Sequence, residues 1–457
     1  GRGGRGGRGK WNKRSRDQWD QDRGGKGGNK QPRGDGGGAD SKKGDGWITA
    51  DDMTNERFES YYQAQGIVQS KQEWEDMLQC LRTPLPVSFR INGSGKLAGY
   101  LRDQIKSELF SKITASGWAE TGEEFKPPKA VEWYPEELAW QFSYSRAEIR
   151  KFAPLNALHE FMKSANEYGS ITRQEVVSMV PPFMLEVQPH HKVLDLCAAP
   201  GSKTFQLLEM VHGSKDEIPT GIVVANDVDM ERCGLLVHQT NRANSPNLLV
   251  TNHEAQHYPA PGGMRYDRVL ADVPCSGDGT LRKATDIWRK WCPSGGCGLH
   301  KLQCQIAVRS AQLLEVGGRM VYSTCSLNPV ENEAVVAELL RKSGGAMELL
   351  DMSGRHPQLK RMAGIKTWKV MDKHGWQERE PEPGKERAKY VTESMFPPVE
   401  GESFPLERCM RILPHFGDTG GFFVAVLEKR GAMPGEAEAL GGGGAAAGGG
   451  GGGRGGG

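Results

Sequence analysis

The chain has 457 residues, a net charge of +2, 37% hydrophobic residues and 61 glycines. This length suffices for two or three domains with substantial cores, and the glycines account for much of the low hydrophobic content. No apolar run approaches the ~20 residues that a membrane-spanning helix needs, and no signal-peptide pattern opens the sequence. Nine cysteines without a tight framework favour reduced thiols in a cytosolic or nuclear setting over disulfides.

Residues 1–46 are of low complexity and open with arginine–glycine repeats. They carry 13 Lys and Arg against 6 Asp, a net charge of +7, whereas the whole chain carries +2. A segment with so few apolar side chains cannot offset its ordering entropy, so we expect a disordered arm. Its charge suits contact with RNA phosphates and bases, and a solubilising tail is the alternative. Residues 431–457 run into Gly and Ala and are expected to form a flexible tail.

Residues 47–168 indicate a smaller, α-rich domain. Helical periodicity covers 51–80, a strand-like alternation covers 87–92, and a helical pattern returns at 97–113. Basic residues lie among six aromatic residues, a composition that suits unpaired RNA, although we expect most of the rings in the core. The aromatic residues are Trp118, Trp133, Tyr134, Trp140, Phe142 and Tyr144. We predict an N-terminal RNA-binding domain, followed at 169–185 by a helix broken at two prolines.

The segment 193–204 has the pattern of a strand, a tight turn and a helix. Val193–Leu196 is a short apolar run, Ala198–Gly201 are small or rigid residues, and Ser202–Val211 shows helical spacing. This is the first unit of a nucleotide-binding α/β sheet, with an ordinary strand-to-helix turn as the equal alternative. It is neither the three-glycine dinucleotide fingerprint nor a P-loop.

From Val193 onward, strand and helix patterns alternate. Such βα units predict a parallel sheet with helices on both faces and a ligand at the carboxyl ends of its strands. Helices are predicted at 299–315 and 331–343. Six further strands are predicted at 221–227, 247–253, 266–273, 318–324, 346–352 and 421–427.

Three acidic residues follow successive strands of this predicted sheet. Asp227 is placed to accept hydrogen bonds from ribose hydroxyls, and Glu254 to meet an adenine edge. Asp272 is expected near the amino-acid tail of a ligand or an incoming base. A ribose, an adenine and an amino group together favour S-adenosylmethionine over an arbitrary nucleotide ligand.

Two cysteines follow neighbouring predicted strands. Cys275 stands in a Gly-rich turn after 266–273, and Cys325 comes directly after 318–324. Asn328, Pro329 and Glu331 predict an N-cap, a first helical residue and a capping box. The helix dipole would then favour the Cys325 thiolate. A buried structural cysteine is the alternative for either residue alone.

Other candidates carry less weight. Trp288 and Trp291 follow the Cys275 turn, where we favour packing over base stacking. Three cysteines near a histidine invite a zinc interpretation, but their irregular spacing favours structural thiols, and we expect no metal. These residues are Cys292, Cys297, Cys304 and His300.

Three motifs together resemble the Sun-domain (NSUN) family of RNA cytosine-5 methyltransferases. They are Asp-Leu-Cys-Ala-Ala-Pro-Gly-Ser-Lys-Thr at 195–204, Asp-Val-Pro-Cys-Ser-Gly at 272–277 and Ser-Thr-Cys-Ser at 323–326. Further matches resemble the tRNA-methylating branch, and the resemblance covers roughly residues 47–429. These further matches lie at 225–229, 276–283, 395–398 and 406–415. The resemblance implies a Rossmann-like class I methyltransferase domain at 169–430, with a seven-stranded, mostly parallel sheet.

The resemblance also implies roles for individual residues. Cys325 would be the nucleophile, and Cys275 would assist product release. The chemistry of the base adds that a hydrogen bond near ring nitrogen 3 favours the adduct, which we expect Asp272 or a neighbour to supply. Glu254 stands where the family has Asp. The residues implied to hold S-adenosylmethionine are Cys197, Ala198, Ala199, Pro200, Gly201, Ser202, Lys203, Asp227, Glu254 and Asp272.

We therefore expect an RNA cytosine-5 methyltransferase that acts on tRNA through a covalent Cys–carbon 6 adduct. The same chemistry on rRNA or mRNA is one alternative, and a non-catalytic RNA-binding protein that uses the arm at 1–46 is another. We expect RNA as partner, no membrane, no metal and a monomer. The basic arm favours a nuclear or nucleolar location, with the cytoplasm as the alternative.

Overall fold

The computed structural model describes residues 52–111, 126–151, 153–213, 218–381 and 386–440. The expected arm at 1–46 and the tail from residue 441 lie outside these ranges. Residues 431–440 of the expected tail include the short helix α14 (Glu436–Ala439), whose Glu436 is buried against Lys429. No helix in the described part of the chain is long and apolar enough to cross a membrane.

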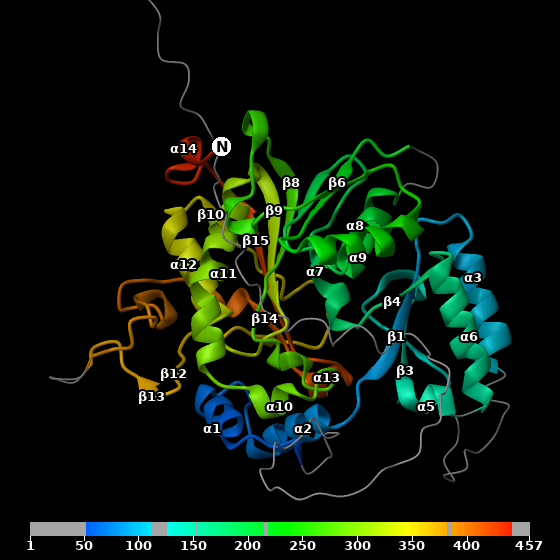
Figure 1. The fold of residues 1–457 in the computed structure, drawn as a ribbon, viewed down its shortest axis with the longest axis horizontal. Coiled ribbons are helices and arrows are strands. Elements are labelled where there is room, and N and C mark those ends of the chain that lie inside the picture. The colour runs from blue at the N-terminus through cyan, green and yellow to red at the C-terminus, as the bar shows by residue number, and fades with distance from the viewer. Residues whose placement is uncertain (1–51, 112–125, 152, 214–217, 382–385, 441–457) are drawn as a thin grey trace, which may run out of the picture. The chain divides into compact units, whose positions relative to one another are not determined.

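A large mixed sheet lies at the centre of the described chain (Figure 1). Its order is β11-β14-β15-β9-β8-β5-β6-β7, with β10 also paired to β15. The strands are β5 (Lys192–Asp195), β6 (Ile222–Asn226), β7 (Leu248–Thr251), β8 (Tyr266–Asp272), β9 (Leu314–Thr324), β10 (Met347–Leu349), β11 (Met362–Ala363), β14 (Met410–Ile412) and β15 (Phe422–Lys429). The strands β7, β6, β5, β8 and β9 run parallel, and β15 is antiparallel to β9.

All seven predicted strands of this sheet are present, and the α/β class is confirmed. The predicted count of seven is wrong, because β11 and β14 extend the sheet beyond β15. These strands have two and three residues, too few to show an alternating pattern in the sequence. Since β10, β11, β14 and β15 all pair antiparallel, the sheet is mixed rather than mostly parallel.

Helices cover both faces of the central sheet (Figure 1). Along β9, Met320 and Tyr322 belong to the core cluster that includes residues of α11 and α12, whereas Val321 belongs to the cluster of α7 and α8. This alternation follows from the two-residue period of a strand. The covering helices are α7 (Val180–Met184), α8 (Ser202–Val211), α9 (Met230–Thr240), α11 (Ser294–Gln312) and α12 (Glu333–Ser343).

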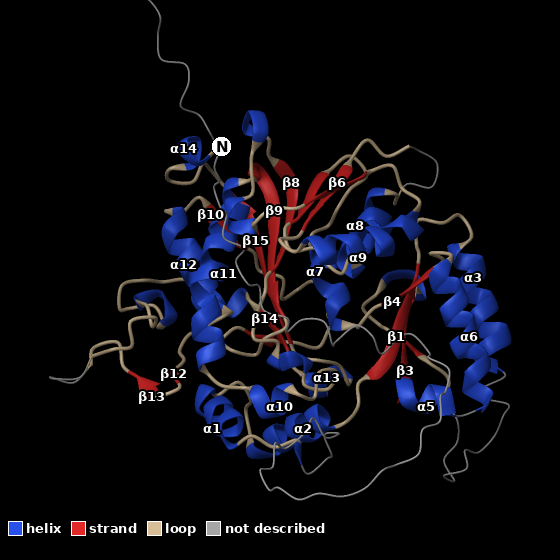
Figure 2. Ribbon diagram, viewed as in Figure 1, coloured by secondary structure: helices blue, strands red, loops and turns tan. Residues whose placement is uncertain are grey.

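The part of the chain before residue 174 contains a second, smaller sheet, which Figure 2 shows apart from the central one. Its order is β2-β3-β1-β4, and all its pairs are antiparallel. The α-rich prediction for this part is therefore incomplete. Its elements are α1 (Glu56–Gln65), α2 (Lys71–Arg82), β1 (Pro86–Ile91), α3 (Ala98–Gln104), the π-helix η3 (Ile105–Phe110), β2 (Lys129–Ala130), β3 (Ala139–Ser145), α5 (Arg146–Lys151), α6 (Ala153–Glu167) and β4 (Ile171–Arg173).

Of two helices predicted in this region, the one at 51–80 is present as the two helices α1 and α2, and the one at 169–185 is largely replaced by other elements. The pattern at 51–80 is interrupted at Gly66, which ends α1 with a φ of 64°, a left-handed conformation that suits glycine. The pattern at 169–185 instead gives β4, the 3-10 turn η5 (Val177–Met179) and α7. Pairing of Ile171 with Ile91 of β1 takes this segment into the small sheet.

The N-terminal elements pack directly on the central part of the chain. Phe58 of α1 contacts the rings of Trp288 and Trp291, and Arg90 of β1 forms a buried ion pair with Glu209 of α8. Of the aromatic residues noted before residue 145, Trp133, Trp140 and Phe142 are in the core, as predicted, Tyr134 and Tyr144 are half-buried, and Trp118 lies outside the described residues. Other short elements include α10 (Ile287–Lys290), the β12–β13 hairpin (Val370–Asp372 and Gly375–Gln377) and α13 (Pro414–Gly417).

Candidate active site

The loop between β5 and α8 is held by backbone hydrogen bonds to its neighbours. The amide of Leu196 donates to the Leu270 carbonyl at 3.0 Å, and that of Ala198 to the Asn226 carbonyl at 2.7 Å. Gly201 has a φ of 108°, and a Cβ there would lie 2.9 Å from Leu236 Cδ1. No side chain caps α8, so its first amides point toward the loop without a side-chain acceptor, as a ligand site at a helix N-terminus requires.

The two acids after β6 and β7 lie in different environments. Asp227 is 2% exposed, accepts from the Ala199 amide at 3.1 Å and pairs with Arg232 at 3.3 Å. The Glu254 side chain is 58% exposed and lies 2.9 Å from His257. Asp227 is thus fixed against the β5–α8 loop, where a ribose would need it. The Glu254 carboxylate instead contacts Gln256 and His257 of its own turn.

Lys203, predicted as part of the cofactor loop, reaches the end of β8. Its ammonium lies 2.7 Å from an Asp272 carboxylate oxygen, and Ser323 donates to the other carboxylate oxygen at 2.7 Å. Burial opposes the charge of Lys203, but the ion pair with Asp272 and interaction with Cys325 raise its pKa overall. This pairing was missed from the sequence, because it joins residues 69 positions apart.

The structure brings the two predicted cysteines together at the carboxyl ends of β8 and β9. These strands are parallel neighbours, with Asp272 opposite Ser323. The Sγ atoms of Cys275 and Cys325 lie 3.3 Å apart. The hydrogen bond with Cys325, together with burial, raises the pKa of the Cys275 thiol well above its usual range.

The predicted helix cap after Cys325 is wrong. Helix α12 begins at Glu333 with Asn332 as N-cap, and no side chain caps it. Asn328 instead accepts from the amide of Val330 at 3.0 Å and from the hydroxyl of Tyr61 at 2.8 Å. Glu331 turns inward to the two cysteine loops. Because residues 326–332 separate Cys325 from the start of α12, the helix dipole does not act on this thiol as predicted.

Two tryptophans and a histidine among the lesser candidates are buried. Trp288 and Trp291 are 0% and 7% exposed and pack against α1, which confirms the packing interpretation. His300 is buried, and its ring nitrogens contact the Val330 carbonyl at 2.6 Å and the Ser394 hydroxyl at 2.8 Å. Within the described ranges, no group of three or more metal-ligating side chains has the geometry to hold an ion.

The resemblance implies S-adenosylmethionine as the cofactor, and the described residues fit such a ligand. The β5–α8 loop offers small residues and an uncapped helix N-terminus. A buried carboxylate at the end of β6 and an exposed one after β7 lie along the same edge. The sulfonium methyl would have to face the cysteine pair, which is beside the next strands of the sheet.

Comparison with known proteins agrees with this geometry. Residues 182–428 match the profile of the 16S rRNA methyltransferase RsmB/F family. Over 387 residues, the chain is 44% identical to the multisite-specific tRNA:(cytosine-C(5))-methyltransferase of Saccharomyces cerevisiae, covering 82% of this chain and 55% of that protein. Over 261 residues, it is 30% identical to the tRNA (cytosine(49)-C(5))-methyltransferase of Pyrococcus abyssi, covering 57% and 71%.

The fold also matches solved structures. A methyltransferase homologue from Pyrococcus horikoshii superposes with a TM-score of 0.53 at 22% identity, covering 81% of this chain and 94% of that one. The chain spans about half the length of the curated yeast and fly relatives it matches. The profile match extends across β5 to β15 and includes both cysteines. The chain therefore belongs to the RsmB/F family of Sun-domain methyltransferases.

Proposed function

We propose that this protein transfers a methyl group from S-adenosylmethionine to carbon 5 of cytosine in tRNA. The observation that carries this proposal is the pair of sulfurs 3.3 Å apart at the ends of β8 and β9. Binding RNA requires neither cysteine, and methylation of an oxygen or an exocyclic nitrogen leaves the pair unexplained. Addition to a pyrimidine ring requires a nucleophile and then a means of elimination.

Carbon 5 of cytosine is a poor nucleophile until a group adds at carbon 6. In the proposed mechanism, the Cys325 thiolate adds there and carbon 5 becomes nucleophilic. S-adenosylmethionine supplies the electrophilic methyl group. The Lys203–Asp272 pair lies beside Cys325 and would hydrogen-bond the polar edge of the base, stabilising the charge that develops on addition. The base must be flipped out or already unpaired to enter.

Release requires loss of the carbon 5 proton. The proton passes to an ionised Cys275, the C–H electron pair forms the carbon 5–carbon 6 double bond, and the carbon 6–sulfur bond breaks with its pair on Cys325. Contact with Cys325 is the largest cause that raises the pKa of Cys275. Conversion of Cys325 to a neutral thioether removes this contact between the two sulfurs. The pKa of Cys275 then falls, so Cys275 ionises more readily once the adduct has formed.

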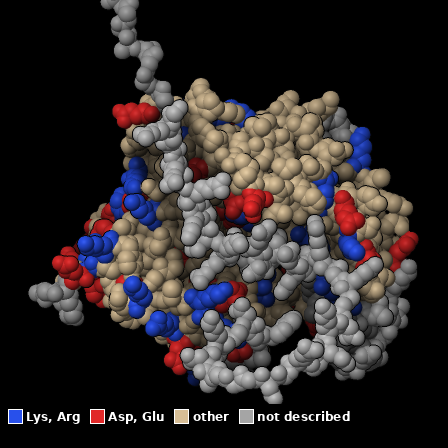
Figure 3. All heavy atoms as spheres, in the orientation of Figure 1, with Lys and Arg blue, Asp and Glu red and all other residues tan. Residues whose placement is uncertain are grey.

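The choice of tRNA rests on the relatives, whose names specify tRNA cytosine carbon 5. Among the described residues on the face in Figure 3, basic and acidic side chains are interspersed. We infer that the arm at 1–46, with its net charge of +7, adds non-specific attraction to RNA. We also propose a nuclear location and a monomeric state, which the basic arm and the two-cysteine site within one chain support.

The test is release of tritium from tRNA labelled at carbon 5 of cytosine, with S-adenosylmethionine present. The proposed enzyme releases tritium in proportion to the methyl groups transferred. A protein that binds this tRNA but releases no tritium would be a non-catalytic RNA-binding protein instead. Labelled rRNA and mRNA fragments, run in parallel, would show whether the substrate is tRNA.

A further inference from the structure

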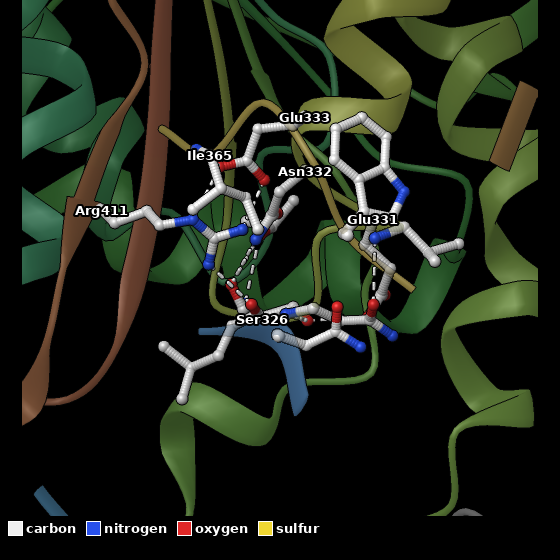
Figure 4. A network of polar contacts seen from close by, with 12 residues as sticks. Ser326, Glu331, Asn332, Glu333, Ile365 and Arg411 are labelled. Atoms are coloured by element: carbon white, nitrogen blue, oxygen red, sulfur yellow. Dashed lines mark hydrogen bonds and ion pairs between the residues drawn. The ribbon is translucent and has the colours of Figure 1, made fainter. Parts of the chain in front are cut away.

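A buried carboxylate joins the loops that carry the two cysteines. Glu331 is 0% exposed. Its carboxylate accepts from the Ser276 amide at 2.8 Å, the Ser276 hydroxyl at 2.5 Å and the Ser326 hydroxyl at 2.7 Å. Figure 4 shows Glu331 beside Ser326. Each serine directly follows one of the cysteines, so a single side chain is bonded to both loops.

Glu331 is held there by hydrogen bonds alone. A fourth donor, the side-chain amide of Gln303, lies 3.1 Å away and also donates to the Pro274 carbonyl at 2.9 Å. Burial raises the pKa of Glu331, and nearby Asp278 adds to this. A buried carboxylate surrounded only by neutral donors costs stability compared with an apolar side chain. Its four acceptor contacts instead fix the geometry of the loops.

The two loops depend on Glu331 to different degrees. The Cys325 loop has a further tie from outside both cysteine loops, because the Leu327 carbonyl accepts from Arg411 at 2.7 Å. Asn332 also donates to the Ser326 carbonyl at 2.8 Å, and Figure 4 shows Asn332 and Arg411 converging on this loop. The Cys275 loop is also tied to the Cys325 loop farther along, because the Gly279 amide donates to the Cys325 carbonyl at 2.9 Å and Asp278 accepts from the Leu327 amide at 2.7 Å. Directly beside Cys275, however, both the amide and the hydroxyl of Ser276 bond to Glu331. Loss of Glu331 would therefore displace Cys275 more than Cys325.

We propose that Glu331 is a positioning residue for product release, holding Cys275 at the distance from Cys325 that elimination requires. This inference rests on the proposed function. Carbon 6 attack needs only Cys325, which keeps its other ties. Removal of the carbon 5 proton requires Cys275 to reach the base while Cys325 is bonded to carbon 6. This step therefore fails when the Cys275 loop shifts.

The test compares Glu331→Gln with wild type on tRNA labelled at carbon 5 of cytosine. We expect kcat for tritium release to fall about ten- to a hundredfold, as for a small misplacement of a reacting group, with little change in KM for tRNA. The rate constant for methyl transfer in a single turnover should fall much less than this kcat. The fraction of enzyme bound covalently to tRNA in denaturing electrophoresis should rise. Ser276→Ala should shift the same fraction in the same direction by a smaller amount.

Glu209→Gln is the matched control, because Glu209 is also a buried carboxylate but contacts Arg90 and the Gly93 amide. Its covalent fraction should match that of wild type. If Glu331→Gln slows methyl transfer and release equally, or leaves the covalent fraction unchanged in a folded protein, Glu331 is an ordinary structural residue. If wild type releases no tritium, the proposed function fails and this inference fails with it.

Discussion

Two adjacent tyrosines of α1 provide a matched pair for testing how the N-terminal helix stabilises the cysteine loops. Tyr61 and Tyr62 are 1% and 0% exposed. The Tyr62 hydroxyl donates to the Asp278 carboxylate, whereas the Tyr61 hydroxyl donates to the Asn328 side-chain oxygen at 2.8 Å. Burial raises the pKa of both hydroxyls, so both remain donors at neutral pH.

Tyr62→Phe removes a hydrogen bond to a charged acceptor and leaves the ring in place. Asp278 keeps two donors, the Trp291 indole at 2.9 Å and the Leu327 amide at 2.7 Å, so the carboxylate is not orphaned. The expected cost is therefore that of one charged hydrogen bond, about 1.5–3 kcal/mol. Tyr61→Phe removes a neutral hydrogen bond, for which about 0.5–1.5 kcal/mol is expected.

Urea unfolding followed by circular dichroism at pH 7 would measure both variants against wild type. We expect Tyr62→Phe to lower the free energy of unfolding by about 1 kcal/mol more than Tyr61→Phe does. Equal losses, or a larger loss for Tyr61→Phe, would refute the argument that the hydrogen bond to the Asp278 carboxylate is the stronger of the two.

Three further predictions concern the cysteines, the arm and a buried acid. Cys275→Ala should form a covalent RNA complex that survives denaturing electrophoresis, Cys325→Ala should form none, and the reverse result would exchange their roles. Deletion of residues 1–46 should weaken tRNA binding and flatten its salt dependence, because 13 positive charges are removed. The methylated positions should stay the same in base-resolution mapping. Burial raises the pKa of Asp195 to about 7, so the stability linked to this group is fully present below about pH 4 and lost as pH rises through 7. Between pH 4 and 8, the free energy of unfolding measured with urea should therefore fall less in Asp195→Asn than in wild type, by up to about 4 kcal/mol.

The sequence by itself determined the central strands and the sheet edge at which the site residues meet. Buried parallel strands are continuous apolar runs bounded by turns, a signal that each segment carries locally. Once five such runs alternate with helices, their carboxyl ends must lie together. The convergence of Asp227, Asp272, Cys275 and Cys325 could therefore be inferred without coordinates.

Only the tertiary structure decided which polar side chains hold that edge in place. The sequence Asn-Pro-Val-Glu at 328–331 has the local pattern of a helix cap, yet Asn328 bonds to Tyr61, 267 positions away, and Glu331 bonds to Ser276, 55 positions away. Lys203 likewise pairs with Asp272 rather than staying with its own loop. A buried polar group takes whichever partner the packed chain brings within hydrogen-bond distance, and such a partner leaves no periodic or local signature in the sequence.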